Sequence, residues 1–272
     1  MYVLACQEVR MEELKILSIG NSFSVDTMQH MANIALALGV KKIKLGNLYV
    51  GGCSIRKHYY HASNDLPAYK YYVNTGNGWE VTPEYKISDA IVSEQWDWIS
   101  IQHGTGDGSY YTKPESYQDL PKLIQYVKEM AWPGVKLAFN MTWVGESDHT
   151  HREIVSYGGN QLLIYQKIAE LTRNLILPMA EIQCVSPTGT AIQNARTAGL
   201  GLLTRDGYHL SYDLGRYIAG MTFLKALTGV DIRGLTWAPE GIGEFERKVA
   251  IESANQAIAV PFAITSLQGN AL

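Results

Sequence analysis

The chain has 272 residues, of which 46% are hydrophobic and 18% are charged, and its formal net charge is −3. This composition is typical of a globular protein with a sizeable core and argues against intrinsic disorder. The charge lacks the basic excess of a nucleic-acid-binding protein, since no basic run extends beyond Lys41 and Lys42. No apolar run approaches the roughly 20 residues that a membrane-spanning helix needs.

Residues 1–13 precede the first predicted strand and form an N-terminal extension. Within it, Val3-Leu4-Ala5-Cys6 has the pattern of a bacterial lipoprotein cleavage box. As given, the sequence predicts a cytoplasmic protein, and with a start further upstream it predicts a cell-envelope lipoprotein. The three cysteines, Cys6, Cys53 and Cys184, are odd in number and too widely spaced for a disulfide framework or a zinc site. We therefore expect them to fill core space.

Short apolar runs bounded by turn residues alternate with longer segments of helical period. This alternation predicts an α/β fold, with a doubly wound sheet of about five parallel strands between helices on both faces, in one domain over residues 14–272. The predicted strands are Lys15 to Ile19, Ile43 to Val50, Trp98 to Gln102, Val135 to Met141 and Leu175 to Met179. The predicted helices are Val25 to Leu38, Ile87 to Ser93, Tyr117 to Met130, Gln161 to Arg173, Leu214 to Leu227 and Phe245 to Ala259.

Two segments, 55–85 and 144–159, interrupt this alternation as insertions. The first is rich in tyrosine and contains a Gly-rich turn at 74–78 between two apolar runs, which predicts a hairpin. Its tyrosines and Trp79 either pack that hairpin or form a wall on which sugars stack. Both insertions follow predicted strands, where open α/β sheets place their ligand clefts, so we expect them to line the cleft.

The first chemical motif is Ile19-Gly20-Asn21-Ser22-Phe23-Ser24, at the change from a strand to a helix. A serine at a helix N-terminus has two readings. Its hydroxyl can cap the helix, or it can attack a carbonyl while the free backbone N–H groups stabilise the oxyanion. Ser22 on its own leaves both readings open.

The second motif is Asp206-Gly207-Tyr208-His209, shortly before a predicted helix. A serine nucleophile needs an imidazole to take its proton and a carboxylate to orient that imidazole, and Asp206 and His209 can supply both from one turn. The alternative is an ordinary Asx-turn at Asp206 and a packing role for His209. The presence of Ser22 favours the catalytic interpretation.

Gly20-Asn21-Ser22-Phe23-Ser24 resembles the N-terminal GDS-type block of SGNH (GDSL-like) hydrolases with Asn for the usual Asp, and the second motif resembles their C-terminal Asp-x-x-His block. Over about residues 14–230 the chain is similar to an SGNH-like branch common in gut Bacteroidetes. The resemblance implies a three-layer α/β/α, flavodoxin-like sheet and a catalytic triad of Ser22, His209 and Asp206, with no cofactor or metal.

The resemblance also implies an oxyanion hole that includes the amides of Ser22 and Gly52, with Gly51 as the alternative to Gly52. The family's third block, Gly-x-Asn-Asp, resembles Gly104-Thr105-Gly106-Asp107, in which Gly106 replaces the Asn. Because losing one such donor typically costs about 10²- to 10³-fold in rate, we expect a substitute. Gln102 is the first candidate, and His103 is the weaker one.

The predicted function is a serine esterase that hydrolyses small O-acyl esters, with O-acetyl groups on carbohydrates as the analogy. Its partners would be small-molecule or glycan esters, with Trp143 and His103 contacting the substrate. Two alternatives remain: a non-catalytic glycan-binding protein on the same fold, and a metal-dependent hydrolase that uses His149 and His151. Two histidines at i and i+2 diverge on a strand and fit poorly on one face of a helix, so they suit a polar loop or a substrate contact better than a metal site.

Overall fold

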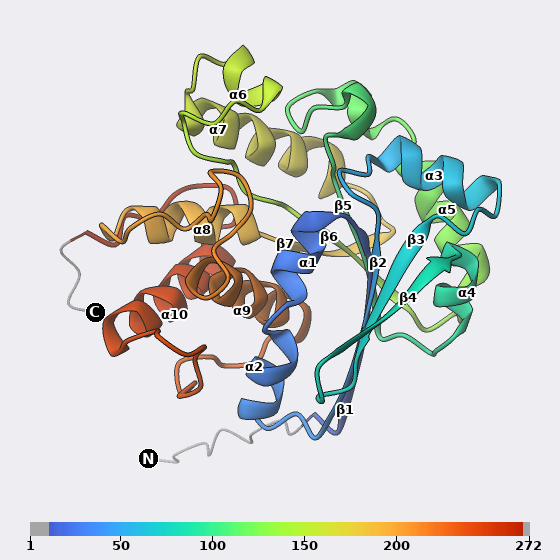
Figure 1. Ribbon diagram of the computed structural model, residues 1–272, viewed down its shortest axis with the longest axis horizontal. Coiled ribbons are helices and arrows are strands. Elements are labelled where there is room, and N and C mark those ends of the chain that lie inside the picture. The colour runs from blue at the N-terminus through green and yellow to red at the C-terminus, as the bar shows by residue number, and fades with distance from the viewer. Residues whose placement is uncertain (1–10, 269–272) are drawn as a thin grey trace.

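A seven-stranded sheet lies between two layers of helices in the computed structural model, which describes residues 11–268 (Figure 1). The strand order is β4-β3-β2-β1-β5-β6-β7, and the five strands from β2 to β7 in this order are parallel. This confirms the predicted doubly wound sheet. The strands are β1 (Glu13–Gly20), β2 (Lys42–Tyr49), β3 (Tyr69–Asn74), β4 (Trp79–Tyr85), β5 (Trp98–Gln102), β6 (Lys136–Asn140) and β7 (Ile182–Ser186).

The helices cover the two faces of the sheet and give the domain two hydrophobic cores. One core contains α1 (Ser22–Met28), α2 (Met31–Ala37), α7 (Gln161–Leu171), α8 (Thr188–Arg196), α9 (Leu214–Thr228) and α10 (Glu244–Ala259). The other contains α3 (Ile55–Ser63), α4 (Ile87–Val92) and α5 (Leu120–Met130). Shorter elements are α6 (Arg152–Ser156), two 3₁₀ turns (Gly106–Gly108 and Pro114–Tyr117) and a π-helical turn (Thr172–Ile176).

The predicted fifth strand was wrong. Residues 175–176 end the π-helical turn that continues α7, residues 177–178 form a turn, and the fifth parallel strand is β7. Ile176 is fully buried, whereas its neighbours Leu175 and Leu177 are 37% and 51% exposed, so most of this apolar run does not face the core as a buried strand would. The predicted helix over 25–38 also divides into α1 and α2, and α1 begins at Ser22.

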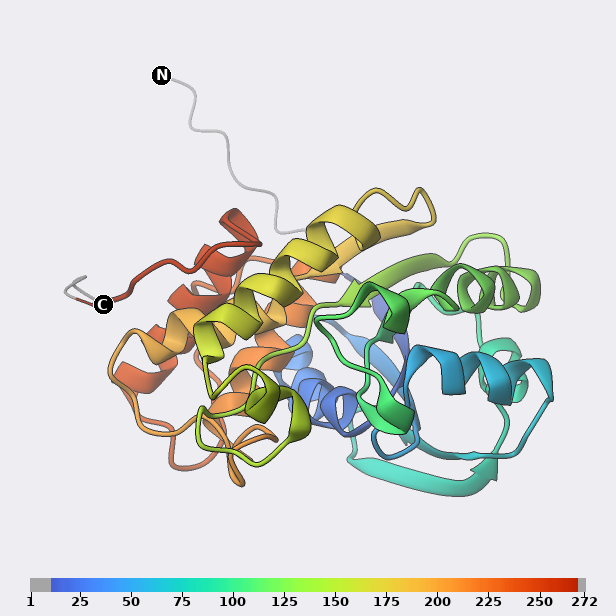
Figure 2. The same ribbon diagram turned by 90° about the horizontal axis from the view of Figure 1, so that it is seen from above.

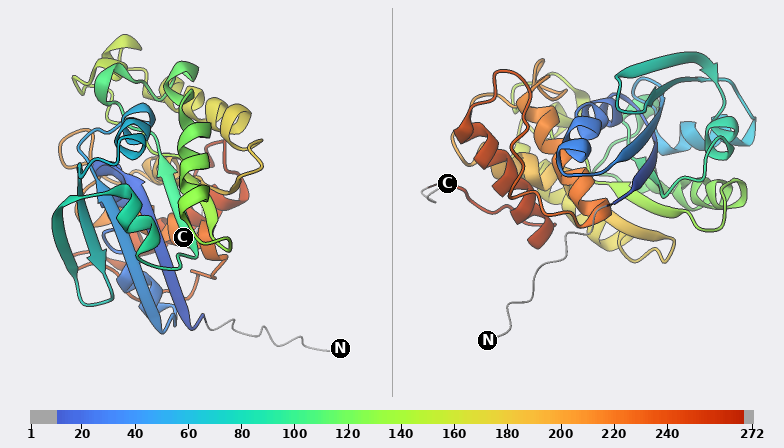
Figure 3. Two further views of the ribbon diagram at one scale, coloured as in Figure 1. Left: turned by 90° about the vertical axis from the view of Figure 1, so that its right-hand side faces the viewer. Right: turned by 90° about the horizontal axis from the view of Figure 1, so that it is seen from below.

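The first insertion contains α3 and the predicted hairpin, which adds two antiparallel strands to one edge of the sheet (Figure 3). Most of its aromatic rings pack the hairpin: Tyr69 and Tyr71 are buried, and the rings of Tyr71 and Tyr85 stack with their centroids 4.5 Å apart. Tyr69, Tyr71 and Tyr85 therefore follow the packing alternative, whereas Tyr72 and Trp79 line a cavity beside α1.

The loops that follow β1, β2, β5 and β6 meet at the carboxyl edge of the parallel strands (Figure 2). There the second insertion, residues 144–159, lies beside the loop after β5, because Arg152 donates to the carbonyl oxygens of Thr105 and Ser109. The cleavage-box pattern at 3–6 falls outside the described residues. Within residues 11–268, none of the helices has the length and apolar composition that crossing a bilayer requires.

Candidate active site

Ser22 is the first residue of α1, directly after the end of β1. The side chain that caps this helix belongs to Asn21, whose Oδ1 accepts from the Phe23 amide at 3.0 Å. The Ser22 hydroxyl is therefore not used as the cap. Its own amide is one of the N–H groups that the start of a helix leaves without an intrahelical partner.

The hydroxyl of Ser22 lies 2.9 Å from Nε2 of His209, and Nδ1 of the same imidazole lies 2.7 Å from Oδ2 of Asp206. The structure thus brings together the three predicted catalytic residues. With Asp206 accepting from Nδ1–H, Nε2 is free to accept the serine proton. This is the arrangement in which an imidazole can act as a general base.

Asp206 serves as more than the partner of the imidazole. Its Oδ1 accepts from the amides of Tyr208 and His209 at 2.9 and 2.7 Å, so Asp206 forms the Asx-turn and also bonds to the His209 ring. Burial alone would raise the pKa of Asp206, but the bonds from the His209 side chain and from these two amides outweigh burial and lower the pKa to about 2. The carboxylate therefore stays ionised at neutral pH.

Asn21, where the SGNH block usually has Asp, joins three loops at the carboxyl edge. Its Nδ2 donates to the carbonyl oxygens of Cys53 and His103, each at 3.2 Å, and its Oδ1 also accepts from Nε2 of Gln102 at 2.8 Å. A carboxylate cannot donate to the two carbonyls, which explains the amide at this position. Gln102 is 1% exposed and points at Asn21, so its predicted role as the substitute oxyanion donor was wrong.

Gly106, which stands where the third SGNH block has Asn, has no room for a side chain. Gly106 donates its amide to the carbonyl oxygen of Gly52 at 2.6 Å, and a Cβ at Gly106 would lie 2.4 Å from that oxygen. A Cβ at Gly104 would lie 1.9 Å from the carbonyl oxygen of Cys53. The loop after β5 therefore packs backbone against backbone on the loop after β2, and glycines are required for this approach.

Gly52 has a left-handed backbone with φ +61°. Its loop begins beside the end of β1, where the amide of Val50 donates to the carbonyl oxygen of Gly20 at 3.4 Å. The structure thus places Gly52 in a tight turn of a loop that starts next to Gly20, two residues before Ser22.

Trp143 and His103, which were predicted to contact substrate, lie in the interior. Trp143 is fully buried, its Nε1 donates to the carbonyl oxygen of Tyr208 at 2.9 Å, and its ring stacks on Phe23 at 4.3 Å between centroids. His103 is 2% exposed and stacks on Tyr117, and burial lowers its pKa to about 3. Both predictions were wrong, because these side chains point into the core and pack against buried rings near the site.

His149 and His151 lie beside the site and stack on the ring of Tyr208. Nδ1 of His149 accepts from the His151 amide, and His151 uses both ring nitrogens, one toward the Glu153 amide and one toward Oγ1 of Thr105. These contacts correspond to the polar-loop alternative. Among the described residues, no group of three or more His, Cys, Asp or Glu side chains is arranged to hold a metal ion.

A cavity of about 190 Å³ lies between α1 and the hairpin. Val25, one turn after Ser22 on α1, lines it together with other residues from α1, β2 and the hairpin: Gln29, Asn47, Tyr72 and Trp79. Sequence reasoning missed it because these five residues are spread over four elements and none carries a motif.

Comparison with known proteins assigns the chain to a family. Residues 15–257 match DUF4886, described as a domain of unknown function. The chain belongs to the DUF4886 family. No match was found among the curated proteins.

This DUF4886 protein is similar to a crystal structure of a DUF4886 family protein from Bacteroides uniformis, with 34% identity and a TM-score of 0.88 over 94% of this chain and 98% of that one. It is also similar to a catalytic mutant of Axe2, an acetylxylan esterase from Geobacillus stearothermophilus, with 14% identity, a TM-score of 0.49 and coverage of 81% and 97%. A member of the lipolytic protein G-D-S-L family from Veillonella parvula matches with 14% identity, a TM-score of 0.43 and coverage of 91% and 99%.

Proposed function

We propose that this DUF4886 protein is a serine esterase in which Ser22 is the nucleophile, His209 the general base and Asp206 the residue that orients His209. The observation that carries the proposal is the continuous pair of contacts, 2.9 Å from Ser22 Oγ to His209 Nε2 and 2.7 Å from His209 Nδ1 to Asp206 Oδ2. Neither contact is needed to cap α1, because Asn21 does that.

In the proposed reaction, His209 takes the Ser22 proton while Ser22 Oγ bonds to the ester carbonyl carbon. The backbone N–H groups of Ser22 and Gly52 bind the oxyanion that forms. His209 then gives its proton to the leaving alcohol, which leaves an acyl group on Ser22. His209 next deprotonates a water that attacks this acyl group, and the acid is released as the serine proton returns.

We propose small O-acyl esters as substrates, such as O-acetyl groups on carbohydrates. The cavity beside α1 supports a small group, since about 190 Å³ is below the roughly 300–1,000 Å³ of pockets that take drug-sized ligands. Val25 lies one turn from Ser22, which puts this cavity on the nucleophile's side of α1.

The test is to label the protein with a fluorophosphonate probe and to assay it on p-nitrophenyl acetate, with and without a chelator. Ser22→Ala is the test variant, and Ser63→Ala, an exposed serine at the end of α3, is the control. We expect labelling and turnover in the parent and the control, no effect of the chelator, and neither labelling nor turnover in Ser22→Ala.

The closure of the Gly106 position favours one alternative, a non-catalytic glycan-binding protein on this fold, because the usual side-chain donor of the oxyanion hole is absent. Glycan binding by a parent protein that is neither labelled nor active would support it. Chelator-sensitive turnover that survives Ser22→Ala would support a metal-dependent hydrolase instead.

A further inference from the structure

Asp26 is a buried carboxylate on α1 that the proposed reaction does not use. It lies four residues after Ser22, so the two side chains are on the same side of the helix and one turn apart. Asp26 is 0% exposed. A buried charge needs partners, because burying an unpaired carboxylate is strongly unfavourable.

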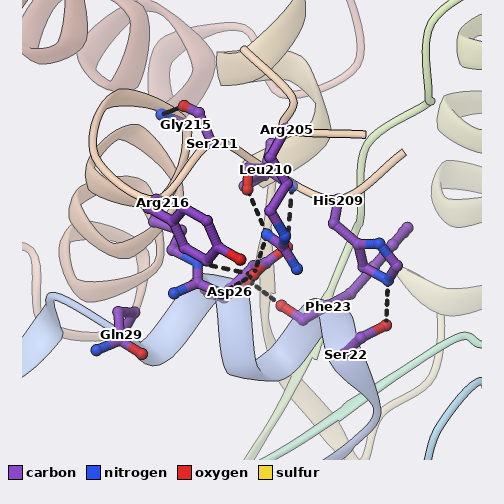
Figure 4. A network of polar contacts seen from close by, with 12 residues as sticks. Ser22, Phe23, Asp26, Gln29, Arg205, His209, Leu210, Ser211, Gly215 and Arg216 are labelled. Carbon is purple, nitrogen blue, oxygen red and sulfur yellow. Dashed lines mark hydrogen bonds and ion pairs between the residues drawn. The ribbon is translucent and has the colours of Figure 1, made fainter. Parts of the chain in front are cut away.

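All the side-chain partners of Asp26 come from the segment that carries His209 and from the helix that follows it (Figure 4). Oδ2 accepts from the amide of Leu210 at 2.9 Å. Oδ1 accepts from Nη1 of Arg205 at 3.0 Å and from Nε of Arg216 at 2.8 Å, and both arginines form ion pairs with it. The ring of Tyr212 covers both guanidinium groups, at 4.9 and 4.7 Å from its centroid.

The segment on which Asp26 acts is short and internally bonded. Thr204 and Leu210 form an antiparallel bridge, and the amide of Arg205 donates to the carbonyl oxygen of His209 at 2.9 Å. Arg205 also donates from Nη1 to the carbonyl oxygen of Leu210. A shift of Leu210 relative to α1 would therefore carry His209 with it.

Two neighbouring contacts join α1 to the loop that carries His209. On α1 these are Ser22 and Asp26, one turn apart, and on the loop they are His209 and its neighbour Leu210. The first contact is the proposed proton-transfer bond, which has to re-form in every turnover. The second is a buried bond to the backbone, reinforced by two ion pairs, and it takes no part in the proton transfer.

We propose that Asp26 is a positioning residue that fixes the distance between Ser22 and His209, with Arg205 and Arg216 holding its carboxylate in place. This inference rests on the proposed esterase function. It assigns to Arg205 the role of an internal counter-ion for Asp26. Asp26 does not contact the reacting atoms, so its effect is on geometry.

The test is Asp26→Glu, which keeps the negative charge and both arginines but moves the carboxylate by one methylene. Because a misplacement of about 1 Å can cost about 10²-fold, we expect kcat on p-nitrophenyl acetate to fall about 10²-fold while KM stays within threefold. The rate at which a fluorophosphonate labels Ser22 should fall by a similar factor. If the ion pairs of Asp26 only stabilise the fold, the activity of each variant should instead be proportional to the fraction of the protein that is folded.

Leu123→Ala is the stability control. Leu123 is fully buried on α5, in the core on the opposite face of the sheet, and its truncation removes packing without touching α1 or the loop. All variants are assayed well below their unfolding midpoints, where we expect Leu123→Ala to keep the parent kcat. If Asp26→Glu does not fold, Arg205→Lys is used, which keeps a cation opposite Asp26, and we expect about a tenfold fall in kcat with KM unchanged.

The outcomes separate this inference from the function on which it rests. A parent that is neither labelled nor active overturns the proposed esterase and this inference with it. An active parent together with a folded Asp26→Glu whose kcat is within threefold of the parent overturns this inference alone. An equal loss of kcat in Leu123→Ala would also overturn it, because the loss would then follow stability and not position.

Discussion

Replacing Asn21 by Asp restores the residue that is usual in the GDS-type block, and we expect it to damage this protein. Asn21 uses both N–H groups of its side chain on buried carbonyl oxygens, those of Cys53 and His103. A carboxylate has no N–H to donate, and its charge would face two oxygen acceptors.

The size of the effect follows from these bonds. A buried acceptor left without a partner costs about 1–3 kcal/mol, so two of them cost about 2–6 kcal/mol. If the carboxyl takes up a proton, one O–H replaces two N–H donors and one carbonyl still loses its partner. A loss of about 4 kcal/mol corresponds to a fall in Tm of roughly 8–16 °C, because each kcal/mol shifts Tm by roughly 2–4 °C in chains of 150–250 residues.

The assay is thermal unfolding of Asn21→Asp beside Asn160→Asp. Asn160 caps α7 with its side-chain oxygen, which accepts from the Leu163 amide at 3.0 Å, and a carboxylate can do the same. We expect Asn160→Asp to unfold within about 2 °C of the parent. Equal Tm values for the parent and Asn21→Asp would refute the reasoning, because they would mean that the two donated bonds are dispensable.

Three further predictions follow from the site and the core. Gly106→Asn introduces the side-chain amide of the third SGNH block but sets a Cβ 2.4 Å from the carbonyl oxygen of Gly52. We therefore expect this variant to have a lower kcat/KM and a lower Tm, and a gain in rate would contradict the expectation. Asp206→Asn should lower kcat by about 10⁴-fold at unchanged fold, since the amide no longer selects the Nδ1–H tautomer, and an effect under tenfold in steady-state kinetics would count against the triad. Burial lowers the pKa of His58 and of His103 to about 3, so between about pH 6.5 and pH 3 the unfolded chain binds two protons that the folded chain does not. These two histidines should then make the free energy of unfolding fall with pH by up to about 2.7 kcal/mol per unit below pH 6.5, and a flat profile in urea unfolding at pH 6.5, 5.5 and 4.5 would contradict this.

Much of the fold was predictable because buried parallel strands leave a local signal. Runs such as 15–19 and 98–102 carry apolar side chains on both faces of the strand, and the structure contains strands at both places. The fifth strand was missed because β7 lies at the sheet edge, where only Ile182 and Ser186 of its five residues are buried. An edge strand of this kind lacks the apolar run that identified the others.

The arrangement of the candidate site was predictable only for the residues that belong to the two sequence motifs. Ser22, Asp206 and His209 lie together as the motifs indicated. The directions of Gln102 and Trp143 could not be read from the sequence, because a residue at a strand end can point either to the cleft or to the core. Gln102 turns inward because the oxygen of Asn21 offers it a buried bond.

The contacts of Asp26 bear on the order in which this chain can fold. Asp26 is translated with the first strand and helix, but Arg205 and Arg216 follow 179 and 190 residues later. During synthesis α1 has no counter-ion for a carboxylate that its final packing buries completely, and burial without one is unfavourable. We therefore expect α1 to stay undocked on the ribosome until the C-terminal part of the domain has emerged, so that Ser22 and His209 come together only in a nearly finished chain.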